Sequence, residues 1–346
     1  MRKNLIIYII FIGLIGLISG CEKDETKVVM LDSPIAPSLV TVPNLTLKRT
    51  SGKDTLVFVG TAVDPGFRAS STYFLEACAK GTDFVESTLI ISAVQDSLLR
   101  ISVSDLNGIL LKKFPADQVS AVDLRIRCVL SVDAGTGNAP RVYNSEVTSV
   151  NVSVYGLPRL DLTGTGVTGK IESALGDGKY SGFVKLDKTK PFTLKDPDAN
   201  IIYGDNGGAL KTNGTAIPAD DNGWYKLTVD VKALTYKMEA YMIGLIGSAT
   251  ANGWNSPDTK MDYNAKEDCW FITTDLTDAQ IKFRLNDGWA TNWGGKGSGD
   301  GNADNYSDAI TVPLGAGGKN IGLTGGAGNY TIKLYISAQK ATVKKN

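Results

Sequence analysis

The chain has 346 residues, in which 36 lysines and arginines balance 36 aspartates and glutamates, so no global charge favours nucleic acid as a partner. It contains no histidine, which excludes serine-histidine and cysteine-histidine catalysis and removes the commonest zinc ligand. We expect neither a cofactor nor a metal, and the length suggests two or three domains.

The N-terminus has the pattern of a lipoprotein signal peptide. Basic residues and an apolar run lead to Ser19 and Gly20, which stand directly before Cys21. Such a lipobox is typical of a signal peptide that is removed to leave a cysteine for lipid attachment. A transmembrane helix is the alternative, but glycines break the run and acidic residues follow it. We therefore predict a signal peptide over residues 1–20 and lipidation at Cys21.

Residues 22–25 resemble the Lys-plus-acid export signal that surface lipoproteins of the Bacteroidetes type carry after the lipidated cysteine. This resemblance implies a protein that is anchored to the outer membrane through lipid and faces the extracellular medium. Residues 21–37 are charged and contain prolines, which is typical of a tether that buries nothing.

Residues 38–156 predict an antiparallel, immunoglobulin-like (Ig-like) β-sandwich. Apolar residues alternate there, for example at Val150, Val152 and Val154, and turn residues separate the alternating segments. The helical pattern that we mark in this region spans residues 104–114.

Three cysteines follow the lipobox, namely Cys78, Cys128 and Cys269, so at least one thiol is unpaired within the chain. Cys128 lies in a strand pattern that places it inward with its apolar neighbours and places Arg125 and Arg127 on the other face. A Cys78–Cys128 disulfide and two small buried hydrophobic side chains fit the sequence equally well.

Residues 157–240 and 241–346 predict two copies of one small β-sandwich. The strand pattern at 223–231 aligns with the pattern at 328–336, and every inward position of the first copy has an apolar counterpart in the second. Further segments align in the same order: 191–194 with 282–285, 202–204 with 292–294, and 214–217 with 318–321.

A resemblance to a known family is carried by four segments of the second copy: 242–250, 253–254, 281–289 and 292–295. They are similar to the carbohydrate-binding repeat of SusE and SusF, the surface lipoproteins of starch-utilisation systems. The resemblance implies an all-β chain of tandem β-sandwich domains, in which two carbohydrate-binding-module-like sandwiches follow the Ig-like domain. It also implies non-catalytic binding of a polysaccharide or oligosaccharide, with a starch-like α-glucan as first candidate, and it admits other Sus-type surface proteins as partners.

Two tryptophans of the second copy have the setting of sugar-stacking residues. A sugar ring presents an apolar face, which can stack on an exposed aromatic ring. Trp254 and Trp289 lie in polar, glycine-flanked loops, where stacking on a ligand and capping of the sandwich end are the two explanations. Trp293 aligns with Tyr203, so a structural and a ligand-binding role fit it equally, whereas Trp270 at a strand start is predicted as core.

Polar residues near these tryptophans can bind the hydroxyl groups of a sugar. If Phe283 packs inward, Lys282 and Arg284 face outward on the same strand and can donate hydrogen bonds. Asn320 supplies a donor and an acceptor. In the family that the chain resembles, two aromatic rings combine with a basic side chain and an amide. The resemblance therefore predicts a carbohydrate site formed by Trp254, Arg284, Trp289 or Trp293, and Asn320.

The first copy lacks these candidates. It has Thr193 at the position aligned with Arg284 and Ala216 at the position aligned with Asn320, so we predict that its site is lost. Its only tryptophan, Trp224, faces outward in the predicted strand, and a different, weaker site there is an alternative.

Acidic and amide side chains recur at alternate positions from Asp300 to Asp308, as at the start of a calcium-binding loop. The glycine and the glutamate that complete such a loop are absent, so we favour a solvated loop over a calcium site.

A glycoside hydrolase is the main alternative in function, and it would need two carboxylates about 5 to 10 Å apart. No such pair stands out, because acids such as Asp258 and Asp262 are predicted in turns or on exposed faces. We therefore predict a protein that is not an enzyme. An adhesin that binds a protein partner is the third class.

Overall fold

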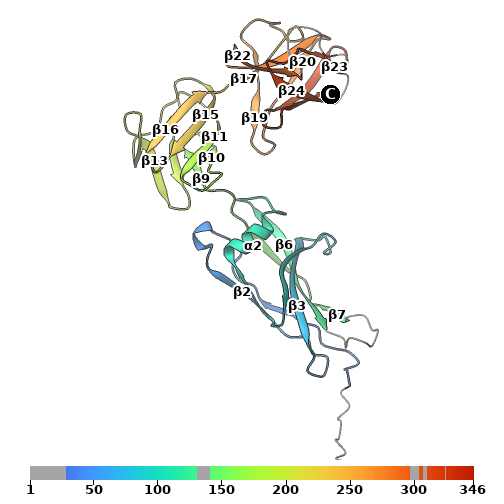
Figure 1. The fold of residues 1–346 in the computed structure, drawn as a ribbon. Coiled ribbons are helices and arrows are strands. Elements are labelled where there is room, and N and C mark those ends of the chain that lie inside the picture. The colour runs from blue at the N-terminus through green and yellow to red at the C-terminus, as the bar shows by residue number, and fades with distance from the viewer. Residues whose placement is uncertain (1–28, 131–140, 297–303, 307–309, 324) are drawn as a thin grey trace, which may run out of the picture. The chain divides into compact units, whose positions relative to one another are not determined.

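The computed structural model describes residues 29–130, 141–296, 304–306, 310–323 and 325–346 (Figure 1). The predicted signal peptide, Cys21 and most of the segment from Asp300 to Asp308 lie outside the described residues. In the described ranges the secondary structure is almost all β-strand, which confirms the predicted fold class. No helix in these ranges is long and apolar enough to cross a membrane.

The chain forms two compact units that meet at Gly156 and Leu157. The first unit has two sheets and one hydrophobic core. One sheet has the order β1 (Leu39–Thr41), β2 (Thr55–Gly60) and β5 (Leu98–Ser102). The other has the order β4 (Thr88–Val94), β3 (Ser71–Ala79), β6 (Val119–Leu130) and β7 (Arg141–Asn144), with β8 (Thr148–Ser153) also paired to β6.

A short helix, α2 (Val103–Leu110), follows β5 and confirms the helical pattern predicted over residues 104–114. The helix begins here because the Ser102 hydroxyl accepts a hydrogen bond from the backbone N–H of Asp105. The Asp105 carboxylate lies in the first turn, where it interacts favourably with the helix dipole. In the described part of this unit, the other helical element is the 3-10 turn η1 (Arg49–Ser51).

Strand β6 illustrates how alternation determines this fold. Its inward side chains are buried in the core, as predicted: Leu124, Ile126, Cys128 and Leu130. Arg125 and Arg127 lie on the opposite face, where both donate to the Glu76 carboxylate, at 2.9 and 2.6 Å. The strand therefore separates an apolar face from a charged one.

Cys78, Cys128 and Cys269 are buried and unpaired, so the disulfide alternative is wrong. On β3, Tyr73 lies opposite Cys128 and is five residues away from Cys78. Five residues of strand span about 16 Å, whereas a disulfide needs Cα atoms about 4.4 to 6.8 Å apart. The thiols of Cys78 and Cys128 therefore serve as small hydrophobic groups.

The second unit contains two hydrophobic cores, one in residues 157–240 (the middle module) and one in residues 241–346 (the third module). The strands of the middle module pair in the order β14-β13-β12-β9-β10-β11-β15-β16. Their bounds are β9 (Arg159–Thr163), β10 (Lys170–Glu172), β11 (Lys179–Leu186), β12 (Thr193–Asp196), β13 (Ile201–Asp205), β14 (Leu210–Thr212), β15 (Gly223–Asp230) and β16 (Thr235–Ala240).

The third module repeats this arrangement with additional strands. Its main path has the order β18-β17-β21-β22-β24-β27-β26-β20-β19, and β25 pairs with both β21 and β23. The bounds are β17 (Ile243–Ile246), β18 (Thr259–Lys260), β19 (Asp262–Asn264), β20 (Cys269–Leu276), β21 (Gln280–Leu285), β22 (Gly288–Gly295), β23 (Asp304–Tyr306), β24 (Ile310–Ala316), β25 (Ile321–Leu323), β26 (Gly328–Tyr335) and β27 (Lys340–Lys345).

Strand pairing corrects the predicted alignment of the two copies by two residues. Leu194 pairs with Tyr203 in the middle module, and Phe283 pairs with Trp293 in the third. Leu194 is therefore the counterpart of Phe283, so the counterpart of Arg284 is Lys195 and not Thr193. A slip of two residues keeps every side chain on the same face of its strand, so hydrophobic alternation does not reveal it.

Paired glycines mark the same close crossing of chains in both modules. A Cβ atom on Gly204 would lie 2.3 Å from the carbonyl oxygen of Thr215, and one on Gly294 would lie 2.1 Å from that of Lys319. Only glycine allows such an approach. The two modules therefore share their framework, including this close contact that requires a glycine.

Aromatic rings fill the junction between the two modules inside the second unit. Phe183 and Trp224 of the middle module lie 5.3 and 5.5 Å from Trp270, measured between ring centroids. The indole N–H of Trp224 donates to the Asp262 carboxylate at 2.9 Å. Trp270 is 2% exposed, which confirms its prediction as core. Trp224 is half-buried and has a packing role here, which leaves little of its ring for the alternative site.

Candidate functional site

The hairpin between β21 and β22 fixes one side of the candidate site. Its two turn residues, Asn286 and Asp287, have φ values of 51° and 57°, which is the type I′ geometry that suits a two-residue hairpin loop. The Asn286 side chain accepts a hydrogen bond from the Met242 N–H and donates to the carbonyl of Ala240, both at 2.8 Å. The turn is thus attached to the start of the module, and Trp289 follows it on β22.

A loop of residues 247–258, the covering loop, forms the other side. It leaves β17 at Gly247, whose φ of 142° is accessible to glycine and strained for other residues. The loop then passes over the face of β21 that carries Lys282 and Arg284, which are 5% and 2% exposed. These two side chains lie opposite Phe283, as predicted, but the expectation that they are exposed is wrong: Asp258 and Ser256 of the loop bind Arg284, and the Trp289 ring lies 5.8 Å from the Lys282 Nζ atom.

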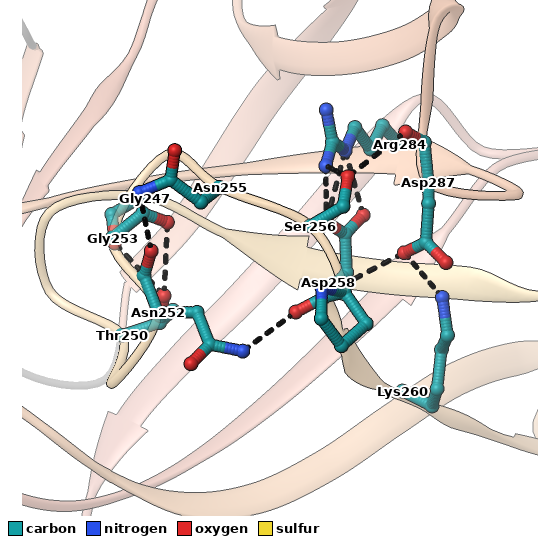
Figure 2. Close-up of polar contacts among 11 residues, drawn as sticks. Gly247, Thr250, Asn252, Gly253, Asn255, Ser256, Asp258, Lys260, Arg284 and Asp287 are labelled. Atoms are coloured by element: carbon teal, nitrogen blue, oxygen red, sulfur yellow. Dashed lines mark hydrogen bonds and ion pairs between the residues drawn. The ribbon is translucent and has the colours of Figure 1, made fainter.

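Hydrogen bonds within the covering loop hold its shape (Figure 2). The Thr250 hydroxyl donates to the carbonyls of Gly247 and Gly253, at 2.9 and 3.2 Å. The Asn252 amide donates to the carbonyl of Pro257 at 2.9 Å. The position of Trp254, which lies between these contacts in the chain, is therefore set before any ligand arrives.

A buried ion pair joins the covering loop to β21 (Figure 2). The Arg284 Nε and Nη2 atoms donate to the Asp258 carboxylate at 2.6 to 2.9 Å, and Nη2 also donates to the Ser256 hydroxyl at 2.7 Å. Asp258 packs directly over Gly244 of β17. A Cβ atom added to Gly244 would lie 2.3 Å from the Cβ atom of Asp258. A glycine at position 244 therefore makes room for the carboxylate.

Trp289 lies over this ion pair and remains half open to solvent. Its ring centre is 4.7 Å from the guanidinium carbon of Arg284, and 48% of the residue is exposed. The Trp254 ring lies beside it, with centroids 6.2 Å apart and planes inclined by 34°. Because the guanidinium occupies one face of the Trp289 ring, the exposed area belongs to its other face and its edges. The two rings form an aromatic platform at the surface.

Asp287 ties the turn to the end of the covering loop. Its carboxylate accepts a hydrogen bond from the backbone N–H of Asp258 at 2.8 Å and an ion-pair contact from Lys260 (Figure 2). Burial acts to raise the pKa of Asp287, but the contacts from Lys260, from this N–H and from the Arg284 charge outweigh it, so the pKa is lowered. Asp287 is therefore a carboxylate at neutral pH.

The structure brings together only some of the predicted residues. Trp254, Arg284 and Trp289 form one cluster, whereas Trp293 packs against the core beside them. Asn320 donates to the side chain of Gln280 at 2.8 Å, four residues along β21 from Arg284, which corresponds to about 13 Å of strand. Asn320 therefore lies apart from the two rings.

The sequence did not identify Asp258 as part of the site. It was predicted in a turn or on an exposed face. It lies at the end of the covering loop, but its side chain is fully buried against Arg284, so exposure is wrong. One signal was present: Arg284 stands between Phe283 and Leu285, and a buried arginine requires a counter-ion. Nothing in the sequence indicates which of the acids supplies it.

A separate cavity lies in the middle module. It has a volume of about 740 Å³ and lies over β11, β15 and β16 of the middle module, with Leu175 and Tyr236 in its lining. It offers no exposed aromatic ring pair. Within the described residues, no group of three or more histidine, cysteine, aspartate or glutamate side chains could hold a metal ion.

In a comparison with known protein families, one family model matches the N-terminal part of the chain. Residues 23–127 match the family model described as SusE outer membrane protein. This bears out the resemblance to the SusE family and supports the predicted location at the outer membrane. The match covers a different part of the chain from the C-terminal segments on which the resemblance was based.

A solved structure is also similar to the chain: the crystal structure of SusF from Bacteroides thetaiotaomicron, at 13% sequence identity and a TM-score of 0.29, over 91% of this chain and 76% of that one. So low a TM-score does not establish a common arrangement, and the fold assignment rests on the strands described above. A search of the curated proteins found no significant match.

Proposed function

We propose that this chain, whose residues 23–127 match the SusE outer membrane protein family, binds polysaccharide at the cell surface without cleaving it. The observation that carries the proposal is the platform of Trp254 and Trp289, in which one ring is 48% exposed while its back is fixed on a buried guanidinium. Indole rings stack on the apolar C–H faces of sugars. A prearranged pair of rings therefore suits a sugar chain.

Arg284 can add a hydrogen bond at the edge of this platform. Its contacts to Asp258 and Ser256 use Nε and Nη2, and Nη1 makes no hydrogen bond within the described part of the chain. An N–H of Nη1 can therefore donate to a hydroxyl oxygen of a stacked sugar. Asn320, at about 13 Å along β21, would contact a further sugar unit, and Trp293 is the secondary aromatic candidate.

The resemblance to SusE and SusF makes a starch-like α-glucan the first ligand to test. A lipid on Cys21 would hold the protein at the outer membrane, facing the medium, and other Sus-type surface proteins are proposed partners. Binding near the membrane would raise the local concentration of the polymer for separate degrading and importing proteins. Replacement of Cys21 by alanine should release the protein from membranes, and continued co-sedimentation would contradict the anchor.

The carboxylates next to the platform favour binding over hydrolysis. They are Asp258 and Asp287, and both are ion-paired, with Arg284 and Lys260. Hydrolysis by two carboxylates needs one of them protonated as the general acid, whereas contacts with cations lower the pKa of Asp287. Neither group is placed for that role.

The test is native gel electrophoresis of the soluble mature chain, made with Cys21 replaced by alanine, through gels with and without embedded glycans. We expect slower migration with soluble starch or with another neutral polysaccharide such as xylan or levan. Equal migration in all gels would favour the adhesin alternative. A reducing-end assay on the same mixtures separates the enzyme, since sustained release of new ends would contradict non-catalytic binding.

A further inference from the structure

Arg284, Asp258 and Trp289 form a stack in which each layer holds the next. Asp258 rests on the bare backbone of Gly244, the guanidinium is bound side-on by Asp258, and the indole lies on the guanidinium. The Arg284 and Asp258 side chains are 2% and 0% exposed. A planar, bidentate contact fixes the tilt of a guanidinium as well as its position.

The middle module provides the same strand pair without this stack. Lys195 lies opposite Asp161 there, at the positions that Arg284 and Gly244 occupy in the third module. In the middle module the acid is on the strand, and in the third module it is on the covering loop. The acid that binds the guanidinium in the third module therefore belongs to the same loop as Trp254.

We infer that Asp258 is a positioning residue of the proposed glycan site, which acts through Arg284 to set the plane of the Trp289 ring. The inference rests on the proposed function for its ligand, a glycan. The claim that Asp258 sets the plane of the Trp289 ring is independent of that function. Asp258 holds the guanidinium under the indole, 4.7 Å from the ring centre, and the same residue holds the end of the loop that carries Trp254. The angle between the two rings, 34°, is therefore determined by a residue that touches no sugar.

If Asp258 has only a structural role, a different experimental result is expected. If the carboxylate only neutralises Arg284, any acid near the guanidinium can replace it. Residues 244 and 258 can be exchanged to test this, as Gly244→Asp with Asp258→Gly. Residues directly opposite on paired strands have Cβ atoms about 4.5 to 5.5 Å apart, so Asp at position 244 can pair with Arg284. The exchange keeps composition and net charge but moves the acid from loop to strand.

The first measurement needs no ligand. Two indoles this close give an exciton contribution in the far-ultraviolet circular dichroism spectrum, which depends on the angle between the rings. Trp224 and Trp270 form a second close pair, so the contribution of Trp254 and Trp289 is taken as the part of the spectrum that Trp289→Ala removes. We expect the soluble mature chain to show this Trp289-dependent contribution and the exchange variant to lose most of it, with a melting temperature near that of the parent. Asp258→Asn should also lose it. A parent-like spectrum in a folded exchange variant would overturn the inference.

The second measurement uses soluble starch as the probe, in titration calorimetry. We expect the exchange variant to bind about tenfold more weakly and Ser256→Ala, which removes the second contact of Nη2, to bind about threefold more weakly. Ser256 is exposed, so this variant should fold even if Asp258→Asn does not. Parent-like affinity in the exchange variant would overturn the inference. Absence of binding by the parent would instead contradict the starch ligand, and the spectra would still decide the role of Asp258.

Discussion

The middle and third modules have the same framework and differ where the candidate site lies. Gly204 and Gly294 make the same close crossing, and Leu194 and Phe283 occupy the same paired position. A large part of that difference is a loop: 8 residues lie between the paired residues Asp161 and Lys170, and 15 lie between Gly244 and Lys260. The framework thus determines the fold, and the loop determines the chemistry at the surface.

The comparison also explains why a buried arginine occurs in one copy only. Lys195 in the middle module is half-buried and has no loop above it that supplies a buried acid. Arg284 is 2% exposed, and burial of its charge is tolerated because Asp258 and Ser256 bind it. Burial of charge therefore follows from the longer loop and not from the shared strands.

The largest expected effect is the difference in the free energy of unfolding between variants of these two basic residues. Arg284→Met leaves the Asp258 carboxylate buried without a partner, which should lower the free energy of unfolding by about 3 to 5 kcal/mol. The matched change in the middle module, Lys195→Met, should cost less than about 1 kcal/mol, because this side chain is half-exposed. Urea denaturation of both variants measures the difference. Equal losses would mean that the Arg284 ion pair does not stabilise the third module in the way described.

The junction tryptophan should affect stability and not binding. Trp224→Ala removes the packing against Trp270 and the hydrogen bond to Asp262, and it should lower the free energy of unfolding by about 2 kcal/mol for a half-buried ring. Its affinity for soluble starch should remain within about twofold of the parent. Calorimetric melting and titration test the two parts separately. Loss of binding with an unchanged melting temperature would place a ligand site in the middle module.

The platform tryptophans should behave in the opposite way. Trp254→Ala and Trp289→Ala should each remove a stacking contact of about 1 to 3 kcal/mol and weaken glycan binding about tenfold to a hundredfold. The melting temperature should change little, because neither ring belongs to the core of the module. The comparison with Trp224→Ala is the control. Melting far below the parent would mean that the two rings cap the sandwich and do not serve a ligand.

The smallest effect is the response to pH. The folded pKa of Asp287 is lowered, so its contribution to stability is complete above its unfolded pKa of about 3.9 and is lost as the pH falls through the folded value. Because the chain has no histidine, we expect flat stability and binding from about pH 5 to 8. Thermal melting from pH 2 to 8 tests this, and Asp287→Asn should lose part of the decrease below pH 4. A transition near pH 6.5 would contradict the prediction.

The sequence contains enough to predict the framework but not the interior of the site. Alternation on β6 and the turn residues that separate the strands predicted the all-β fold, and a strand-start position predicted Trp270 as core. The predicted loop setting of Trp254 and Trp289 brought both into the candidate set, although Trp289 lies on strand β22 and not in a loop. What alternation lacks is information on neighbours far apart in the chain. It did not distinguish Thr193 from Lys195, because both lie on the same face of one strand.

The burial of Arg284 was missed for the same reason. A strand pattern identifies two faces, and it does not state whether the outward face is open or covered. Here residues 26 positions earlier in the chain cover it, through the contact of Asp258 with Arg284. Such a contact depends on loop conformation, which the positive φ at Gly247 and the hydrogen bonds of Thr250 determine.

The short pairing of β17 with β18 has a consequence for how such proteins can diversify. Gly244 pairs with Lys260 and Leu245 with Thr259, so the ends of the covering loop are closed by the framework whatever lies between them. Doubling the length of a loop costs only about 0.6 kcal/mol of closure entropy, and the middle module closes the same strands with about half as many residues. Insertion, deletion or exchange of this one segment can therefore give a duplicated sandwich a new ligand, or none, while selection for folding continues to act on the rest.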